Sequence, residues 1–167
     1  IIASSLNTGT SVTNLVTSGD ITFWDNVSIS KTSGGNATLT LQTPNSIFMG
    51  TGSSIRSTSG NLNIVLWSNS SSVGGCIEIG NTVQLSSNGG DITLGGGSNL
   101  LTGYADGLNV AHGIYIGASS LTANGGNIVM RGKTEWDAAS QAMALDGTFS
   151  TSGNGNITLN GYASTGT

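Results

Sequence analysis

The sequence is poor in charged, basic and aromatic residues, and each shortage excludes a class of function. Only 7% of its 167 residues are charged, against roughly a quarter in ordinary soluble proteins, and 5% are aromatic. The basic residues are too few to form a positive stripe, so we expect neither nucleic acid nor an anionic membrane surface as a partner. No apolar run approaches the roughly 18 residues of a transmembrane helix, so we expect no membrane insertion. The basic residues are Lys31, Arg56, Arg131 and Lys133.

Cysteine and histidine each occur once, which limits disulfide, metal and catalytic chemistry. Cys76 cannot form an internal disulfide, and its place at a strand start in GGCIEI favours a small buried side chain over a reactive thiol. His112 permits no multi-histidine metal site and leaves one possible triad base, and NVAHGIY is typical of a turn beside a strand start. GGSNLLTG lacks the repeated G-x-D of calcium-binding repeats. We therefore expect no metal site, no cofactor and no enzymatic activity.

Glycine, serine, threonine and asparagine replace the missing charge. Such a polar composition could indicate disorder, because polar tracts bury too little apolar surface to offset the entropy lost on ordering. However, 36% of the residues are hydrophobic, and Ile, Leu and Val recur in short alternating runs. Alternation with a period of two predicts strands that each bury one face.

An internal repeat is the most informative feature of the chain. A glycine, then Asn or Asp, then alternating apolar residues occurs six times. Two earlier apolar strands complete the unit, so that IFMGTGSSIRSTSGNLNIVL and IEIGNTVQLSSNGGDITLGG align without a gap. The six copies read GDITF at Gly19, GNATL at Gly35, GNLNI at Gly60, GDITL at Gly90, GNIVM at Gly126 and GNITL at Gly155.

The repeat predicts an all-β fold, a right-handed parallel β-helix with three-stranded coils. Three short strands and three turns need about 18 to 27 residues, which most of the glycine spacings fit as one coil plus a loop. The shorter step from Gly19 to Gly35 indicates two different corners of one coil. No helical apolar stripe lies between the strands, so the sheets must bury their inner faces against one another. We expect about five to seven coils.

The whole chain, residues 1–167, is interpreted as one β-helix segment of a longer repeat protein. The opening IIASSL reads like the middle of a strand, and no signal peptide precedes it. No polar or helical cap is evident at either end, although solenoids need their terminal strand edges covered. We expect further coils or identical subunits to cover both ends.

The acids in the repeated motif are interpreted as turn residues. Asp20 and Asp91 occupy the motif position held by Asn in the other copies. Because Asn cannot act as an acid or base, this exchange indicates hydrogen bonding at a corner or stacking between coils.

The best candidates for ligand binding are the two longest insertions, about residues 95–113 and 131–142. Both leave the coil after equivalent strands, at Leu94 and Met130, so we expect them to protrude side by side. Loops on a rigid scaffold commonly carry function. The side chains there most able to hold a ligand are Tyr104, Asp106 and Trp136.

Two segments resemble a known group of proteins. NIVLWSNSSSVGGCIEIGNTVQLSSNGGDITLGGG and TGYADGLNVAHGIYIGASSLTANGGNIVMRG are similar to the filamentous haemagglutinin-like large exoproteins of Gram-negative bacteria, over about residues 20–161. The resemblance implies a secreted β-helical adhesin or surface filament, located outside the cell or on its surface. It implies a glycan or protein of a host or neighbouring cell as partner, and carries over no catalytic residue. The secretion domain of that group is not visible in the sequence.

An enzymatic alternative depends on two acids, Glu135 and Asp137, which flank Trp136 in RGKTEWDAASQ. Some parallel β-helices cleave polysaccharides with paired carboxylates. The alternative function is therefore a β-helical protein that binds or degrades polysaccharide.

Overall fold

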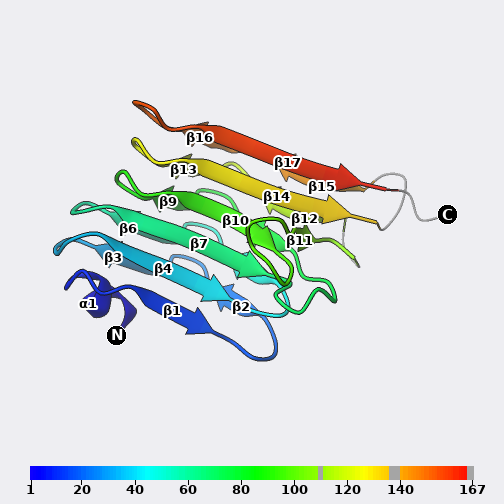
Figure 1. The fold of residues 1–167 in the computed structure, drawn as a ribbon, viewed down its shortest axis with the longest axis horizontal. Coiled ribbons are helices and arrows are strands. Elements are labelled where there is room, and N and C mark those ends of the chain that lie inside the picture. Colours follow the sequence, from blue (N-terminus) through cyan, green and yellow to red (C-terminus); the bar gives the residue numbers. More distant parts are fainter. Residues whose placement is uncertain (109–110, 136–139, 165–167) are drawn as a thin grey trace.

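The computed structural model describes residues 1–108, 111–135 and 140–164, and its strands form a right-handed parallel β-solenoid of three sheets (Figure 1). Sheet A comprises β1 (Val12–Leu15), β4 (Ala37–Gln42), β7 (Leu62–Ser68), β10 (Ile92–Gly96), β14 (Ile128–Thr134) and β17 (Ile157–Ala163), with β11 (Ala105–Asp106) also paired to β14. Sheet B comprises β2 (Ile21–Phe23), β5 (Ile47–Met49), β8 (Ile77–Ile79), β12 (His112–Ile116) and β15 (Gln141–Leu145). Sheet C comprises β3 (Ser28–Lys31), β6 (Ser54–Ser57), β9 (Gln84–Ser86), β13 (Ser120–Thr122) and β16 (Thr148–Ser150).

Each coil contributes one strand to sheet B, then one to sheet C, then one to sheet A. The described chain completes this circuit five times, beginning with β2, β5, β8, β12 and β15. The predicted β-helix with three-stranded coils is therefore confirmed. Gly19 precedes a strand of sheet B and Gly35 a strand of sheet A, which confirms that these two motif copies mark different corners of one coil.

The core is a set of apolar columns that run along the solenoid axis. Alternation directs every second residue of a strand inward, and the parallel register places like residues above one another. Each fully buried Ile or Leu side chain contributes roughly 1.5–3 kcal/mol relative to exposure. The most regular columns are Leu39–Ile64–Ile92–Ile128 and Leu41–Leu66–Leu94–Met130 in sheet A, Ile47–Ile77–Ile114 in sheet B and Ile55–Leu85–Leu121 in sheet C, all almost fully buried.

Asn and Asp side chains link successive coils at the corners. Asp91 Oδ1 accepts hydrogen bonds from the backbone N–H (2.7 Å) and the side-chain amide (3.1 Å) of Asn127 in the next coil. Asn127 Oδ1 in turn accepts from the N–H of Asn156 at 3.0 Å. At a different corner, Asp20 Oδ1 accepts from the N–H of Ser46 at 3.0 Å. The predicted hydrogen-bonding role of Asp20 and Asp91 is confirmed.

The N-terminal end differs from the prediction. Ile2–Leu6 form a short helix, α1, rather than a strand, and it covers the first coil at one end of the stack (Figure 1). The fully buried Leu6 packs into the core, and Asn7 Oδ1 accepts the N–H groups of Thr32 (2.7 Å) and Ser33 (3.3 Å). The prediction that this end has no helical cap was therefore wrong, because five residues are too few to show a helical period.

The last described coil presents inward positions that are less covered. Ile157 and Leu159 of β17 continue the columns of Ile128 and Met130, yet they are 42% and 47% exposed. The outer edge of this coil thus offers both backbone hydrogen-bonding groups and apolar surface. Among the described residues, no helix has the length and apolar character needed to cross a membrane.

Candidate functional site

The connections from sheet A to sheet B form the variable corner of the solenoid, here named the A–B corner. The first connections are short, 16–20 and 43–46, whereas the third extends over 69–76 and the fourth starts at residue 97 and reaches β12 at residue 112. Connections from sheet B to sheet C stay short in every coil, as at 50–53 and 80–83. Variation at one corner of a regular scaffold is the usual place for binding loops.

The loop 97–104 leaves sheet A and returns to it. Strand β10 pairs with β14 as far as Leu94 and Met130, and β11 then resumes the same ladder opposite Gly132 and Lys133. A side chain on Gly103 at the loop base would collide with the carbonyl oxygen of Gly96, so only glycine permits this close approach.

The protruding parts of the A–B corner are narrower than the predicted insertions. In the first, 95–113, residues 105–106 belong to β11 and residues 112–113 to β12. In the second, 131–142, residues 131–134 continue β14 and residues 141–142 begin β15.

Tyr104 and Asp106, two of the predicted binding residues, lie at the base of this loop. The half-buried Tyr104 lines a hollow of about 230 Å³ together with Asn99, Thr102 and Lys133. Asp106 is only 5% exposed and borders a second hollow, of about 300 Å³, with Asp20 and Asn45 of earlier coils. The third predicted residue, Trp136, and the neighbouring Asp137 lie outside the described residues.

Asp106 is held by an ion pair. Its Oδ2 lies 2.8 Å from Nζ of Lys133, while its Oδ1 is buried and has no partner among the described atoms. Its backbone exchanges two hydrogen bonds with Gly75 of the previous coil, at 2.8 and 3.0 Å. The hydrogen bond to Asp106 raises the pKa of Lys133, and Glu135 at 3.7 Å adds to the same effect. The side chain that was predicted to bind a ligand therefore fastens β11 to β14.

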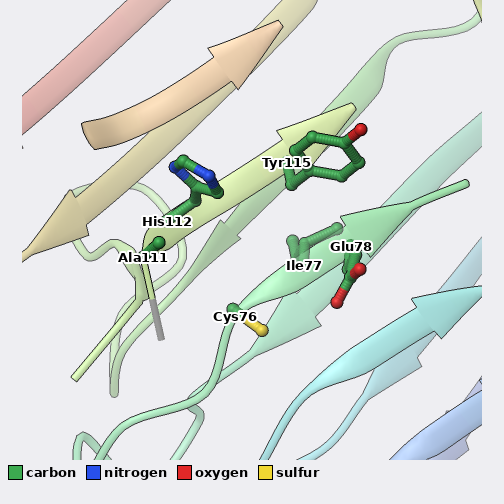
Figure 2. Close-up of a pocket in the computed structure, with 6 residues that line it drawn as sticks. All are labelled: Cys76, Ile77, Glu78, Ala111, His112 and Tyr115. Atoms are coloured by element: carbon green, nitrogen blue, oxygen red, sulfur yellow. The ribbon is translucent and has the colours of Figure 1, made fainter. Parts of the chain in front are cut away.

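A further hollow, of about 250 Å³, opens on the outer face of sheet B beside this corner (Figure 2). Glu78 on β8 and Cys76, the residue directly before β8, border it on one side. His112 and Tyr115 of β12 border it on the other. The His112 and Tyr115 rings stack, with centroids 5.8 Å apart and planes inclined by 26°.

Cys76 is a buried thiol, as its sequence position indicated. It is 5% exposed, and its Sγ donates a weak hydrogen bond to Ser46 Oγ at 3.5 Å. Burial raises the pKa of Cys76, whereas a nucleophilic cysteine requires a lowered one. The raised pKa therefore disfavours the thiolate form of Cys76.

The outer face of sheet B carries functional candidates that the sequence analysis missed. Phe48, Glu78 and Tyr115 are direct register partners on β5, β8 and β12, and all three face outward. The signal was present in the aligned repeats, since these are the middle residues of IFMG, IEIG and IYIG.

The chemistry available at these sites is that of aromatic faces, carboxylates and hydroxyl groups. Within the described ranges, no three His, Cys, Asp or Glu side chains lie close enough to hold a metal ion.

No protein-family model matches the chain, and neither does any curated protein or solved structure with which it was compared.

Proposed function

We propose that this chain is a structural and adhesive segment of an extracellular bacterial filament or secreted adhesin, without catalytic activity. One observation carries the proposal: five described coils repeat the same interior in register, while the A–B corner varies far more in length than the other two corners. A scaffold of constant cross-section with loops on one corner suits display of binding surfaces along a rod.

End-to-end contact with further coils or identical subunits is the second part of the proposal. Ile157 and Leu159 stand in inward columns but are 42% and 47% exposed, so another coil placed on β17 would extend both columns and the backbone ladder. Burial of such residues supplies roughly 25 cal/mol for each Å² of apolar surface removed from water.

The proposed location is the exterior or surface of a Gram-negative bacterium. Support comes from the resemblance of the repeats to filamentous haemagglutinin-like exoproteins. The proposed partner is a glycan or protein on a host or neighbouring cell.

Electron microscopy of the native polypeptide tests the scaffold role. Rods are expected, with a length that grows by about 4.8 Å for each coil in the parent protein. Compact isolated particles at every concentration would contradict the filament proposal.

An assay for polysaccharide cleavage tests the absence of catalysis. The purified chain is incubated with neutral and acidic polysaccharides, and newly formed reducing ends are measured. No release above buffer is expected. Cleavage that disappears in Glu135→Gln would instead establish the polysaccharide-degrading alternative.

A further inference from the structure

The outer face of sheet B carries a line of aromatic and acidic side chains along the solenoid axis. Phe48, Glu78 and Tyr115 are consecutive partners in the ladder, so neighbouring side chains are separated by one strand spacing of about 4.8 Å. Figure 2 shows Glu78 and Tyr115 side by side on β8 and β12, with Ile77 turned to the other side of its strand. The line therefore lies on the surface and not in the core.

Two hollows border Glu78 on this line, and together they are here named the groove. The first, of about 250 Å³, extends from Glu78 toward Tyr115 and His112. The second, of about 320 Å³, extends from Glu78 toward Phe48 and Trp24. The residues that line the two hollows come from four successive coils, from β2 to β12.

The aromatic rings at the ends of the groove are available to a ligand. Trp24 is 76% exposed, although an indole of this size ordinarily buries most of its surface. Phe48 is half-buried on the same face. At the other end, Tyr115 is held by its stack with His112, which orients the ring before any ligand arrives.

Glu78 supplies hydrogen-bond acceptors between the rings. Its side chain is exposed and forms no hydrogen bond or ion pair within the described part of the chain. Asp25 adds a second carboxylate near Trp24. Among the residues that the structure describes, no lysine or arginine lines either hollow.

We propose that this groove binds a neutral oligosaccharide, which lies along the solenoid axis. Aromatic faces pack against the C–H faces of sugar rings, and a carboxylate accepts hydrogen bonds from vicinal hydroxyl groups. Because no described lysine or arginine lines either hollow, the two carboxylates disfavour acidic glycans. The inference rests on the adhesive function proposed above and names the ligand of one of its surfaces.

The shape of the groove distinguishes this ligand from a single cation. An ammonium ion is held best by aromatic faces that converge on one point. Here the rings follow one another along a sheet face, and Phe48 and Tyr115 are two strand spacings, about 10 Å, apart. An elongated ligand of more than one ring matches this arrangement.

Titration with defined sugars tests the proposal. The purified chain is titrated calorimetrically with cellohexaose, xylohexaose, mannohexaose and maltohexaose, and with oligogalacturonate and choline as charged counterparts. Binding of at least one neutral hexasaccharide is expected, with an affinity that salt does not alter. Binding of none of the neutral sugars, or of choline or oligogalacturonate alone, would overturn the proposal.

Three variants locate the binding. Tyr115→Ala, Glu78→Gln and Trp24→Ala are each expected to weaken binding at least tenfold. Tyr162→Ala is the matched control, because Tyr162 is 51% exposed on β17 of sheet A, away from the groove, and its loss should leave the affinity unchanged. If Tyr115→Ala fails to fold, Trp24→Ala still tests the site, since the Trp24 ring lies largely in solvent and its removal should not disturb folding.

Equal affinity of the wild type and all three groove variants would place the sugar elsewhere and refute the site. Rod formation in the microscope is independent of these titrations. Rods without sugar binding would refute the groove alone, whereas the absence of rods would contradict the filament proposal.

Discussion

The carboxylate of Asp106 and the ammonium group of Lys133 lie 2.8 Å apart, and the two residues are direct register partners on β11 and β14. The pair closes the base of the loop 97–104, at the point where the chain returns to sheet A. The Asp106 side chain is 6% exposed and that of Lys133 is 28% exposed. The carboxylate is therefore largely shielded from water, and the ammonium group of Lys133 is its ionic partner. The loop and its lining are thereby positioned by a salt bridge within the ladder.

Removal of the cation should destabilise the fold. Lys133→Met leaves the buried Asp106 carboxylate without an ionic partner, and breaking a buried pair in this way costs about 3 kcal/mol. Chemical denaturation monitored by circular dichroism measures the change. Arg131→Met on the same strand is the control, with an expected change within about 0.5 kcal/mol. Equal effects of the two substitutions would show that the ion pair is not what stabilises the loop base.

The same pair should make stability sensitive to alkaline pH. Asp106 raises the pKa of Lys133 in the folded state above its ordinary value of 10.5. A raised lysine pKa contributes stability that is complete below the unfolded pKa and is lost as the pH rises through the folded one. The wild type should therefore lose more stability above pH 10.5 than Asp106→Asn, in which the largest cause of the raised lysine pKa is removed and only the contribution of Glu135 remains.

Denaturation midpoints of both proteins, followed from neutral pH to about pH 12, measure this difference. Burial also raises the pKa of Cys76, which lowers stability in the alkaline range, but this contribution is common to both proteins and cancels. Parallel curves for the two proteins would mean that Lys133 titrates without influence from Asp106.

Much of the fold could be predicted because, in a stacked repeat, short stretches of sequence indicate which residues of each strand face the core. The alternation in Ile92-Thr93-Leu94 is sufficient to show which residues face inward, and recurrence of that pattern implies parallel stacking. The Asn and Asp positions of the motif likewise predicted the corner hydrogen bonds, as at Asp91 and Asn127.

The parts that could not be predicted depend on contacts between coils. Residues 131–134 read as a loop, but they extend β14 because β17 pairs with them on one side and β11 on the other. The outward line of Phe48, Glu78 and Tyr115 differs in chemistry from coil to coil, so it becomes a groove only when the register is known.

Close stacking of glycines at one corner predicts a sharp contrast between two substitutions. A methyl group on Gly126 would overlap the carbonyl of Gly90 in the coil below, whereas one on Gly35 would have no atom within 4 Å. Gly126→Ala should cost about 1–3 kcal/mol or prevent folding. Gly35→Ala should be neutral or stabilise by up to about 1 kcal/mol, because it restricts the unfolded chain.

Thermal and chemical denaturation of these two variants make the comparison. Gly126→Ala with wild-type stability would mean that neighbouring coils can separate at this corner without cost. Loss of stability in Gly35→Ala would indicate a close contact at the first coil that the structure lacks.

A buried lysine should stabilise the first corner and the helix that covers it. Lys31 is fully buried, and its Nζ donates to the carbonyl oxygens of Ser33 (2.8 Å), Gly34 (3.2 Å) and Ser59. In the next coil its register partner Ser57 makes the corresponding bonds with a hydroxyl group, to Ser59 at 3.1 Å and to the following glycine at 2.9 Å. The turn between sheet C and sheet A therefore requires an inward side chain that donates hydrogen bonds to its carbonyl oxygens.

Lys31→Met keeps the side-chain volume but removes every donor, and it should cost about 3 kcal/mol, since buried carbonyls lose charged hydrogen bonds. The deficit should persist at high salt, because the acceptors are carbonyls in the interior and not screened surface charges. Arg56 is an exposed cation on β6, so Arg56→Met is the control and should change stability by less than about 0.5 kcal/mol.

Because Asn7 accepts hydrogen bonds from Thr32 and Ser33 of the same turn, Lys31→Met should also accelerate hydrogen exchange in α1. Unchanged exchange in α1 would mean that the helix docks independently of this corner.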